Sequence, residues 1–241
     1  MPKDEQGQWI KINPKLDGGP GGRDYYDENN GWTYAWQVQH DIGGLIELLG
    51  GKSQAQARLD QLFHESLDES PYGFQAVFPD STGMVGQFSM GNEPSFHIPY
   101  LYNFFGAPWK TQKRIRLLLD VWFTDTFFGI PGDEDGGGMS AFVVFSQMGF
   151  YPVVPGLPYY TIGSPVFEKV TIPLQNGKVF TVLAPGASKE NKYIDRAFLN
   201  DKELDGPFFT HEDLMKGATL RLVMTNRPNK TWGGEAKPPM P

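Results

Sequence analysis

Carboxylates, amides and aromatic residues gather in three segments of the sequence, at Asp24–Trp36, Gly86–His97 and Gly132–Ser140. The first segment sets charged and amide side chains among aromatic rings. This mixture suits a carbohydrate, because sugar C–H faces pack on rings while sugar hydroxyls form hydrogen bonds with carboxylates and amides. The alternative is structural: Asp27 or Asn29 caps a helix, and the rings fill the core.

The second segment places Asn92 and Glu93 at the predicted start of a helix, with His97 one turn further along. Its context is apolar, so a buried Glu93 would have to be ion-paired, bound to a cation or protonated. A helix cap is the competing interpretation, because acidic side chains favour the positive end of the helix dipole.

In the third segment, the acidic run Asp133-Glu134-Asp135 precedes three consecutive glycines. A glycine-rich backbone can approach a ligand closely. The segment does not fit an EF-hand, since Gly137 stands where the third oxygen ligand belongs and no glutamate follows at the required distance. A solvated acidic turn is the other interpretation.

The composition excludes several classes of protein. Lys+Arg 21 against Asp+Glu 28 gives a net charge of −7, without a basic run, so we expect no nucleic-acid partner. No window approaches the roughly 18 apolar residues of a membrane span, and the polar start is not a signal peptide. The absence of cysteine excludes disulfides, thiolate zinc sites and cysteine nucleophiles.

The apolar spacing indicates which elements must position these segments. It predicts helices over residues 31–49, 53–70, 94–105, 109–126 and 140–148. Short β-type runs follow at residues 161–162, 166–172, 178–183 and 219–224, with a hairpin turn at Asn176-Gly177. We therefore expect a mainly α protein with a β-rich C-terminal region, divided near residue 152 into domains 1–152 and 153–241.

Seven motifs occur in a fixed order between Trp9 and Trp232. They are Tyr26-Asp-Glu-Asn-Asn-Gly-Trp32, Gly91-Asn-Glu-Pro-Ser95, Tyr100-Leu-Tyr-Asn103, Pro108-Trp-Lys-Thr-Gln112, Gly132-Asp-Glu-Asp135, Met139-Ser-Ala141 and Gly149-Phe-Tyr-Pro152. Together they resemble glycoside hydrolase family 92, whose members are calcium-dependent exo-acting α-mannosidases that invert the anomeric centre. The resemblance runs in the family's order from about Trp9 to Trp232, which is nearly the whole chain, and as a set the motifs are highly specific.

The resemblance implies that the chain corresponds to the C-terminal part of such an enzyme. Family members carry an N-terminal β-sandwich and an (α/α)6 barrel. About five helices are predicted here, roughly half of a barrel, so we expect a partial (α/α)6 barrel followed by a small antiparallel β segment. Apolar faces should then be exposed where the missing N-terminal part of the same protein would pack.

The resemblance also assigns catalytic roles. Glu28 corresponds to the general acid and Asp135 to the general base, with Asp133 assisting or sharing that role. Inverting hydrolysis needs two such carboxyl groups about 6.5–9.5 Å apart, and the acid must stay protonated. One departure is Asn30-Gly31, where relatives more often have Gly followed by Asn.

In this family a Ca²⁺ ion binds the O2 and O3 hydroxyls of mannose. The nearest suitable oxygen donors are Gln87, Asn92 and Glu93. Residues expected to bind substrate are Trp32, Trp36, Asn92, Glu93 and His97. The implied substrate is an α-mannoside or an N-glycan, and the implied location is secreted or periplasmic.

Two other functions stay open from the sequence. Because the barrel is incomplete, the chain is a catalytically silent fragment or a carbohydrate-binding module that retains part of a mannose pocket. Exposed apolar helix faces would favour an incomplete enzyme, and polar, self-contained faces an independent binding domain. Alternatively, it is a structural α+β protein without a sugar site, if the three acidic and aromatic segments lie apart in space.

Overall fold

The computed structural model describes residues 3–18 and 23–239, which form two compact units. The first unit comprises residues 1–38, 57–96 and 122–139; the second comprises residues 39–56, 97–121 and 140–241. Both units therefore draw on separate stretches of the chain. The domain boundary near residue 152 stays a prediction, although the described chain does change there from helices to strands.

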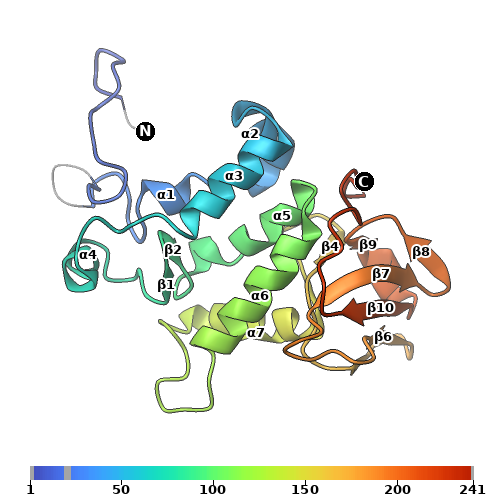
Figure 1. The fold of residues 1–241 in the computed structure, drawn as a ribbon. Coiled ribbons are helices and arrows are strands. Elements are labelled where there is room, and N and C mark those ends of the chain that lie inside the picture. The colour runs from blue at the N-terminus through green and yellow to red at the C-terminus, as the bar shows by residue number, and fades with distance from the viewer. Residues whose placement is uncertain (1–2, 19–22, 240–241) are drawn as a thin grey trace. The chain divides into compact units, whose positions relative to one another are not determined.

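The first unit is built from short elements joined by loops (Figure 1). They are α1 (Gly31–Tyr34), most of α3 (Lys52–Leu62), α4 (Pro71–Val77), the antiparallel pair β1 (Met84–Val85) and β2 (Phe88–Ser89), and the 3₁₀ helices η2 (Glu93–Ser95) and η4 (Asp135–Gly137). Helix α4 was not predicted from the sequence. Its start follows a local rule, since the Ser70 hydroxyl accepts from the Gly73 N–H and Pro71 occupies the first turn.

The continuous helix predicted over residues 31–49 is wrong. The chain forms α1, then η1 (Gln39–Asp41) and α2 (Ile42–Leu48). The break follows from Asp41, whose carboxylate accepts from the Gly44 N–H at 2.8 Å and starts a new helix. The apolar spacing persists through the break, which is why it indicated one element.

The helix predicted over residues 94–105 is also interrupted, as η2, η3 (Ile98–Tyr100) and α5 (Leu101–Phe104). Pro94 and Pro99 each occupy the first turn of a 3₁₀ helix, where the missing proline N–H does no harm. Helix α6 (Pro108–Trp122) ends before the predicted Thr126, whereas α7 (Gly138–Met148) agrees closely with its prediction.

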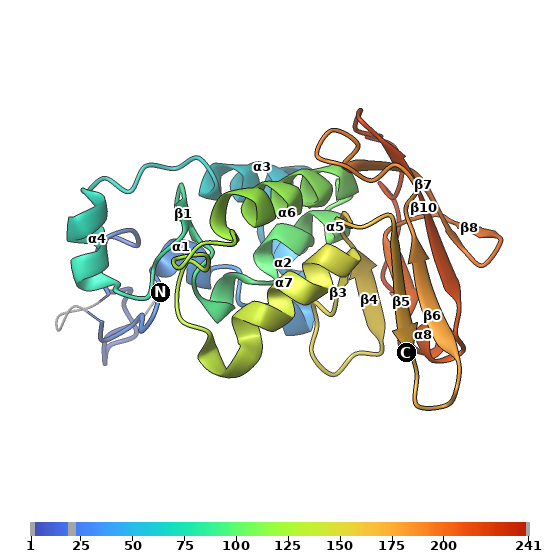
Figure 2. The ribbon, with the colours of Figure 1, turned by 90° about the horizontal axis from the view of Figure 1, so that it is seen from below.

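The second unit contains two sheets (Figure 2). The five-stranded sheet has the order β5 (Lys169–Pro173), β6 (Val179–Leu183), β10 (Thr219–Thr225), β7 (Tyr193–Leu199) and β8 (Lys202–Leu204). The three-stranded sheet has the order β3 (Phe150–Tyr151), β4 (Tyr159–Ile162) and β9 (Phe208–Thr210), and α8 (His211–Met215) follows β9.

The expected antiparallel segment is therefore only partly correct, because β10 pairs with β6 in parallel. The hairpin predicted at Asn176-Gly177 is confirmed between β5 and β6, where Gly177 has a φ of 78°. Strands β7, β8 and β9 were not predicted. Their pairing partners are distant in sequence or their apolar runs are short.

An aromatic cluster forms the core of the second unit. Phe150, Phe180 and Phe209 are almost fully buried, and the Phe180 and Phe209 rings stack at 5.5 Å. Buried polar side chains connect α6 to the sheets. The Gln112 Oε1 accepts from the Ile194 N–H at 3.0 Å, and the Arg116 guanidinium donates to the Pro165 carbonyl at 2.8 Å.

Several large apolar side chains are exposed. On α6 and α7 they are Leu117, Val121 and Val144, at 37%, 50% and 53%. Phe127 and Phe128 are 95% and 87% exposed on a tight turn. The turn is held by the Thr124 N–H, which donates to the Gly129 carbonyl. None of the described helices is long and apolar enough to cross a membrane.

Candidate active site

A cavity of about 120 Å³ in the first unit is lined by Glu28, Asp133 and Asp135. The other residues around it are Pro79, Asp80, Thr82, Gly91, Asn92 and Gly132. The three segments singled out in the sequence thus meet at one cavity. This arrangement argues against the structural α+β alternative, which required them to lie apart.

Asn30 fixes the backbone that carries Glu28. Its Oδ1 accepts from the N–H groups of Trp32 and Thr33 at 3.1 and 3.3 Å, so the cap of α1 is Asn30 rather than Asp27 or Asn29. The Asn30 Nδ2 donates to the Gln87 Oε1 at 2.6 Å. The buried amides of Asn30 and Gln87 therefore fix the segment that carries Glu28 beside the start of β2.

Close packing around position 31 accounts for the glycine in this chain. A Cβ atom at this position would lie 2.9 Å from the Tyr26 hydroxyl and 3.0 Å from the Pro14 Cβ. Only glycine fits there without a shift of its neighbours. The order Asn-Gly thus gives a cap followed by a close packing contact, and Glu28 stays half-buried at the cavity.

Two glycines bring the second and third segments together. A Cβ atom on Gly91 would overlap the Pro131 carbonyl oxygen, and a Cβ atom on Gly132 would overlap the Gly91 carbonyl oxygen. The Thr82 hydroxyl also donates to the Pro131 carbonyl. This contact places Asn92 and Asp133 on the wall of the same cavity.

The loop that carries Asp135 has an unusual backbone. Asp135, Gly136 and Gly137 have φ values of 49°, 64° and 101°. The left-handed region costs a residue with a side chain about 1 kcal/mol or more, although aspartate tolerates it better than most. Such outliers persist where the surroundings impose them, and they cluster at functional sites.

Glu93 belongs to the same electrostatic cluster. Glu93 is exposed rather than buried, but partial desolvation of its carboxyl raises the pKa of Glu93, and a hydrogen bond with Asp135 and the charges of Asp135 and Glu28 raise it further. A backbone N–H partly offsets these effects. Glu93 therefore interacts with two of the predicted catalytic residues.

The predicted calcium ligands fit a cation only in part. Gln87 is buried with both ends engaged: its Oε1 accepts from Asn30, and its Nε2 donates to the Ser66 carbonyl at 2.6 Å. Asn92 differs, since its buried Nδ2 has no partner among the described residues. Because an amide can be turned to present either atom, Asn92 can offer an oxygen.

No group of three His, Cys, Asp or Glu side chains suited to a metal occurs in the described part of the chain. Asn92 and Glu93 are thus compatible with an oxygen-ligated cation, whereas Gln87 is committed to protein hydrogen bonds.

The aromatic residues predicted to bind sugar are buried. Trp32 is 8% exposed, and the Arg58 guanidinium lies 3.5 Å from the centroid of its ring. Trp36 is 2% exposed. His97 belongs to the second unit, where its Nδ1 lies 3.1 Å from the Gln39 Nε2. The sugar-binding roles of Trp32, Trp36 and His97 stay predictions.

Asp80 and Thr82 line the cavity but were not singled out in the sequence. Asp80 also pairs with Arg23 at 3.3 Å. Their segment reads Pro79-Asp-Ser-Thr-Gly83, a run of turn-forming residues with one carboxylate. That composition is the signal that would have identified a fourth loop.

The chain resembles proteins of one family over most of its length. A model described as the glycosyl hydrolase family 92 catalytic domain matches residues 1–226. An uncharacterized secreted glycosidase of Arthroderma benhamiae is 36% identical over 210 residues, which make up 86% of this chain and 24% of that protein.

Solved structures give the same result. A family 92 α-mannosidase from Bacteroides thetaiotaomicron, in complex with mannoimidazole, is 35% identical with a TM-score of 0.88 over 98% of this chain and 31% of its own. A family 92 inverting mannosidase from the same organism is 38% identical, with a TM-score of 0.81 over 96% and 32%. The chain thus spans about a quarter to a third of the length of these relatives.

Proposed function

The chain belongs to glycoside hydrolase family 92, and from this premise we propose that it supplies the catalytic carboxyl groups of an inverting exo-α-mannosidase. The observation that carries the proposal is that Glu28, Asp133 and Asp135 line one cavity. Because the chain spans only part of its relatives' length, the proposal concerns this chain within a longer protein.

In the proposed reaction, the Glu28 carboxyl gives its proton to the glycosidic oxygen while the bond from that oxygen to the anomeric carbon breaks. Asp135 takes a proton from a water molecule that attacks the same carbon from the opposite face. The electron pair of the broken bond stays on the leaving oxygen, and β-mannose is released. Asp133 shares the base role or orients the water.

We extend the proposal to a Ca²⁺ ion held by Asn92 and Glu93, with further oxygen ligands from outside this pair. When bound, the ion would bind and polarise two sugar hydroxyls. A calcium titration followed by calorimetry tests this directly. We expect binding that is lost in Asn92→Ala and Glu93→Gln and kept in the exposed control Glu203→Gln; equal heats in all variants would contradict it.

Fold and location are proposed on the same basis. The exposed side chains of Leu117, Val121 and Val144 support a partial (α/α)6 barrel whose apolar faces meet the remainder of the protein. The curated relative from Arthroderma benhamiae is named as secreted, which supports a secreted or periplasmic location. The substrate class is an α-mannoside or an N-glycan.

Kinetics of the longer protein test the catalytic roles. Asp135→Asn should lower kcat about 100- to 10,000-fold on both an α-linked mannobiose and a nitrophenyl α-mannoside. Glu28→Gln should lower it by a similar factor on mannobiose but much less on nitrophenyl mannoside, since a good leaving group needs little protonation. Proton NMR of the first product formed should detect β-mannose.

Unchanged mannobiose turnover in both variants, or α-mannose as the first product, would overturn the proposal. The alternative is a binding module that retains part of the mannose pocket. In that case the variants would alter mannobiose affinity, and no turnover would be detected with or without the remainder of the protein.

A further inference from the structure

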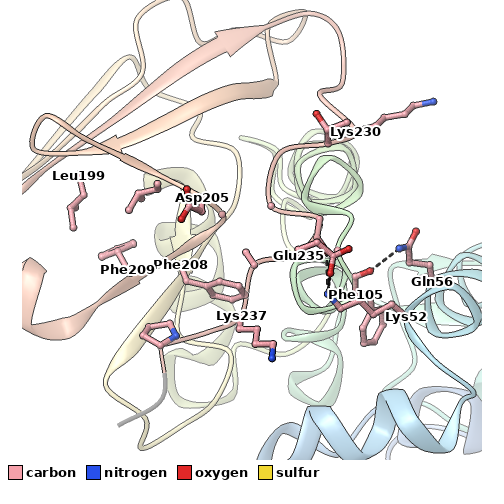
Figure 3. A pocket seen from close by; sticks show the side chains of 18 of the residues that line it. Lys52, Gln56, Phe105, Leu199, Asp205, Phe208, Phe209, Lys230, Glu235 and Lys237 are labelled. Carbon is pink, nitrogen blue, oxygen red and sulfur yellow. Dashed lines mark hydrogen bonds and ion pairs between the residues drawn. The ribbon is translucent and has the colours of Figure 1, made fainter.

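A second and larger cavity, of about 1100 Å³, lies within the second unit (Figure 3). Its walls come from the first turns of α3, the end of α5, the segment from β7 to α8, and residues 230–239. None of the residues with a predicted role in catalysis or calcium binding lines it. The cavity is therefore unassigned by the proposed function.

The wall formed by residues 230–239 is closely packed against the rest of the unit. A Cβ atom on Gly206 would overlap the Ala236 Cβ, and one on Gly106 would overlap the Gly234 carbonyl oxygen. The Trp232 indole N–H donates to the Leu204 carbonyl at 3.0 Å. These contacts give the cavity a defined shape.

The charges around the cavity cancel. Three lysines and three acids line it: Lys52, Lys230, Lys237, Asp205, Asp213 and Glu235. Most of them are engaged. Lys52 pairs with Glu235 at 3.8 Å, Asp213 closes the capping box of α8, and the Lys230 ammonium lies 5.4 Å from the Trp109 ring.

Two charged groups are left for a ligand. Asp205 and Lys237 are exposed, and neither forms a hydrogen bond or ion pair with another described residue. In Figure 3 the Phe208 side chain lies between them, but its ring is only 7% exposed because it packs against the Phe104 ring. The apolar floor is formed by the half-buried side chains of Leu199 and Leu204. A carboxylate, an ammonium group and an apolar floor thus face one space.

We propose that this cavity binds a neutral oligosaccharide. Vicinal hydroxyls can donate to the Asp205 carboxylate and accept from the Lys237 ammonium, while sugar C–H groups cover the apolar floor. An anionic ligand would meet Asp205 and Glu235, and a purely apolar ligand would leave both free charges buried without partners. The volume suits more than one sugar ring, since ordinary small-molecule pockets measure about 300–1,000 Å³.

NMR titration of the 241-residue chain tests this, with Asp135→Asn present to prevent turnover. The probe is an α-linked mannotriose, and mannose 6-phosphate is the anionic comparison. We expect saturable shifts of the amides of residues 204–206 and 233–237. Asp205→Ala and Lys237→Ala should each weaken binding about tenfold, the loss typical of a charge-assisted hydrogen bond.

Matched controls separate the cavity from its surroundings. Asp201→Ala and Lys202→Ala remove exposed charges beside Asp205 but outside the cavity, and should change affinity less than about twofold. Gly206→Ala should abolish binding by displacing Ala236. In the control Gly43→Ala, the new Cβ atom meets its nearest neighbour at an ordinary 3.7 Å.

Three results would overturn the inference: no shifts at residues 204–206 and 233–237, tighter binding of mannose 6-phosphate than of mannotriose at these amides, or equal effects of Asp205→Ala and Asp201→Ala. Shifts at Glu28 and Asp133 report on the first cavity. They are scored separately, so this inference stands or falls on residues 204–206 and 233–237, whereas the proposed function is tested by the kinetics of the longer protein.

Discussion

The two units use their buried polar side chains in partly different ways. In the second unit, Asn103, Gln112 and Arg116 each have one buried atom without a partner among the described residues, but their other atoms bond to distant backbone groups. In the first unit, the buried amides of Asn30 and Gln87 also connect elements, whereas the Asn92 amide nitrogen lines the cavity without a partner among the described residues. Buried polar groups therefore connect elements in both units, and at the cavity wall one of them stays available.

The backbone shows the same contrast. The second unit has a five-stranded sheet over an aromatic core, whereas the first relies on helices of a turn or two and on loops in close contact. Polar side chains that bind a ligand cannot also use the same atoms to form hydrogen bonds with one another. Their backbone is therefore fixed by hydrogen bonds of neighbouring residues such as Asn30. The first unit should therefore gain stability from changes that damage catalysis.

The largest expected effect concerns the aromatic core. Phe209→Ala should lower the free energy of unfolding by about 3–5 kcal/mol, because it removes a ring that is 2% exposed. Native-state hydrogen exchange should record the loss at the amides of β10. The exposed Phe128→Ala is the control, and should change stability by less than about 0.5 kcal/mol. Equal losses of stability in Phe209→Ala and Phe128→Ala would contradict the role of the aromatic core in the second unit.

A smaller effect is expected at the cap of α1. Asn30→Ala should cost about 1–2 kcal/mol, since it frees two N–H groups and leaves the Gln87 Oε1 without its donor. Exchange should accelerate at Trp32 and Thr33. The exposed Asn226→Ala serves as the control, and protection lost equally in both variants would contradict the role of Asn30.

Asp135→Gly should raise stability by about 0.5–1 kcal/mol while abolishing catalysis, because glycine adopts the left-handed backbone at little cost. Asn200→Gly is a matched control in the second unit, where Asn200 has a φ of 47°. It should stabilise less, because it also removes the hydrogen bond that the Asn200 Oδ1 accepts from the Thr219 N–H at 2.9 Å, and it should leave turnover unchanged. Urea unfolding and mannobiose kinetics measure both quantities. Destabilisation by Asp135→Gly would show that the carboxylate supports the fold.

The smallest effect is a pH dependence. Since the pKa of Glu93 is raised in the folded protein, its contribution to stability is complete below the ordinary glutamate pKa of about 4.3 and is lost as the pH rises through the raised value. Glu93→Gln should flatten this part of the profile. The free energy of unfolding, measured between the ordinary and the raised pKa of Glu93 with Glu203→Gln as control, checks the direction of this dependence. A contribution of Glu93 to stability that increases with pH would contradict it.

Local signals in the sequence predicted local structure. The turn at Asn176-Gly177 is encoded by its two residues, and the acidic loops were recognisable from their glycines. The break before α2 was missed because Asp41 competes with an apolar pattern that continues past it. The parallel pairing of β6 with β10 joins residues almost forty positions apart, which no local pattern specifies.

The carboxylates around the cavity at Glu28 and Asp133 were predictable from the sequence, but the backbone contacts that close the cavity were not. Three carboxylate segments were found, yet the contact that joins two of them depends on Gly91 and Gly132. A glycine in a sequence does not reveal which backbone will approach it. Asp80 was missed for a related reason, because a single acid in a turn looks like ordinary surface.

The exposed rings of Phe127 and Phe128 should influence how this chain behaves in concentrated solution. These two rings form an exposed apolar patch that favours association between molecules, whereas the net charge of −7 makes the molecules repel one another. At physiological ionic strength the Debye length is about 8 Å, and added salt shortens it further. Salt should therefore promote clustering, and storage at low ionic strength keeps the chain dispersed.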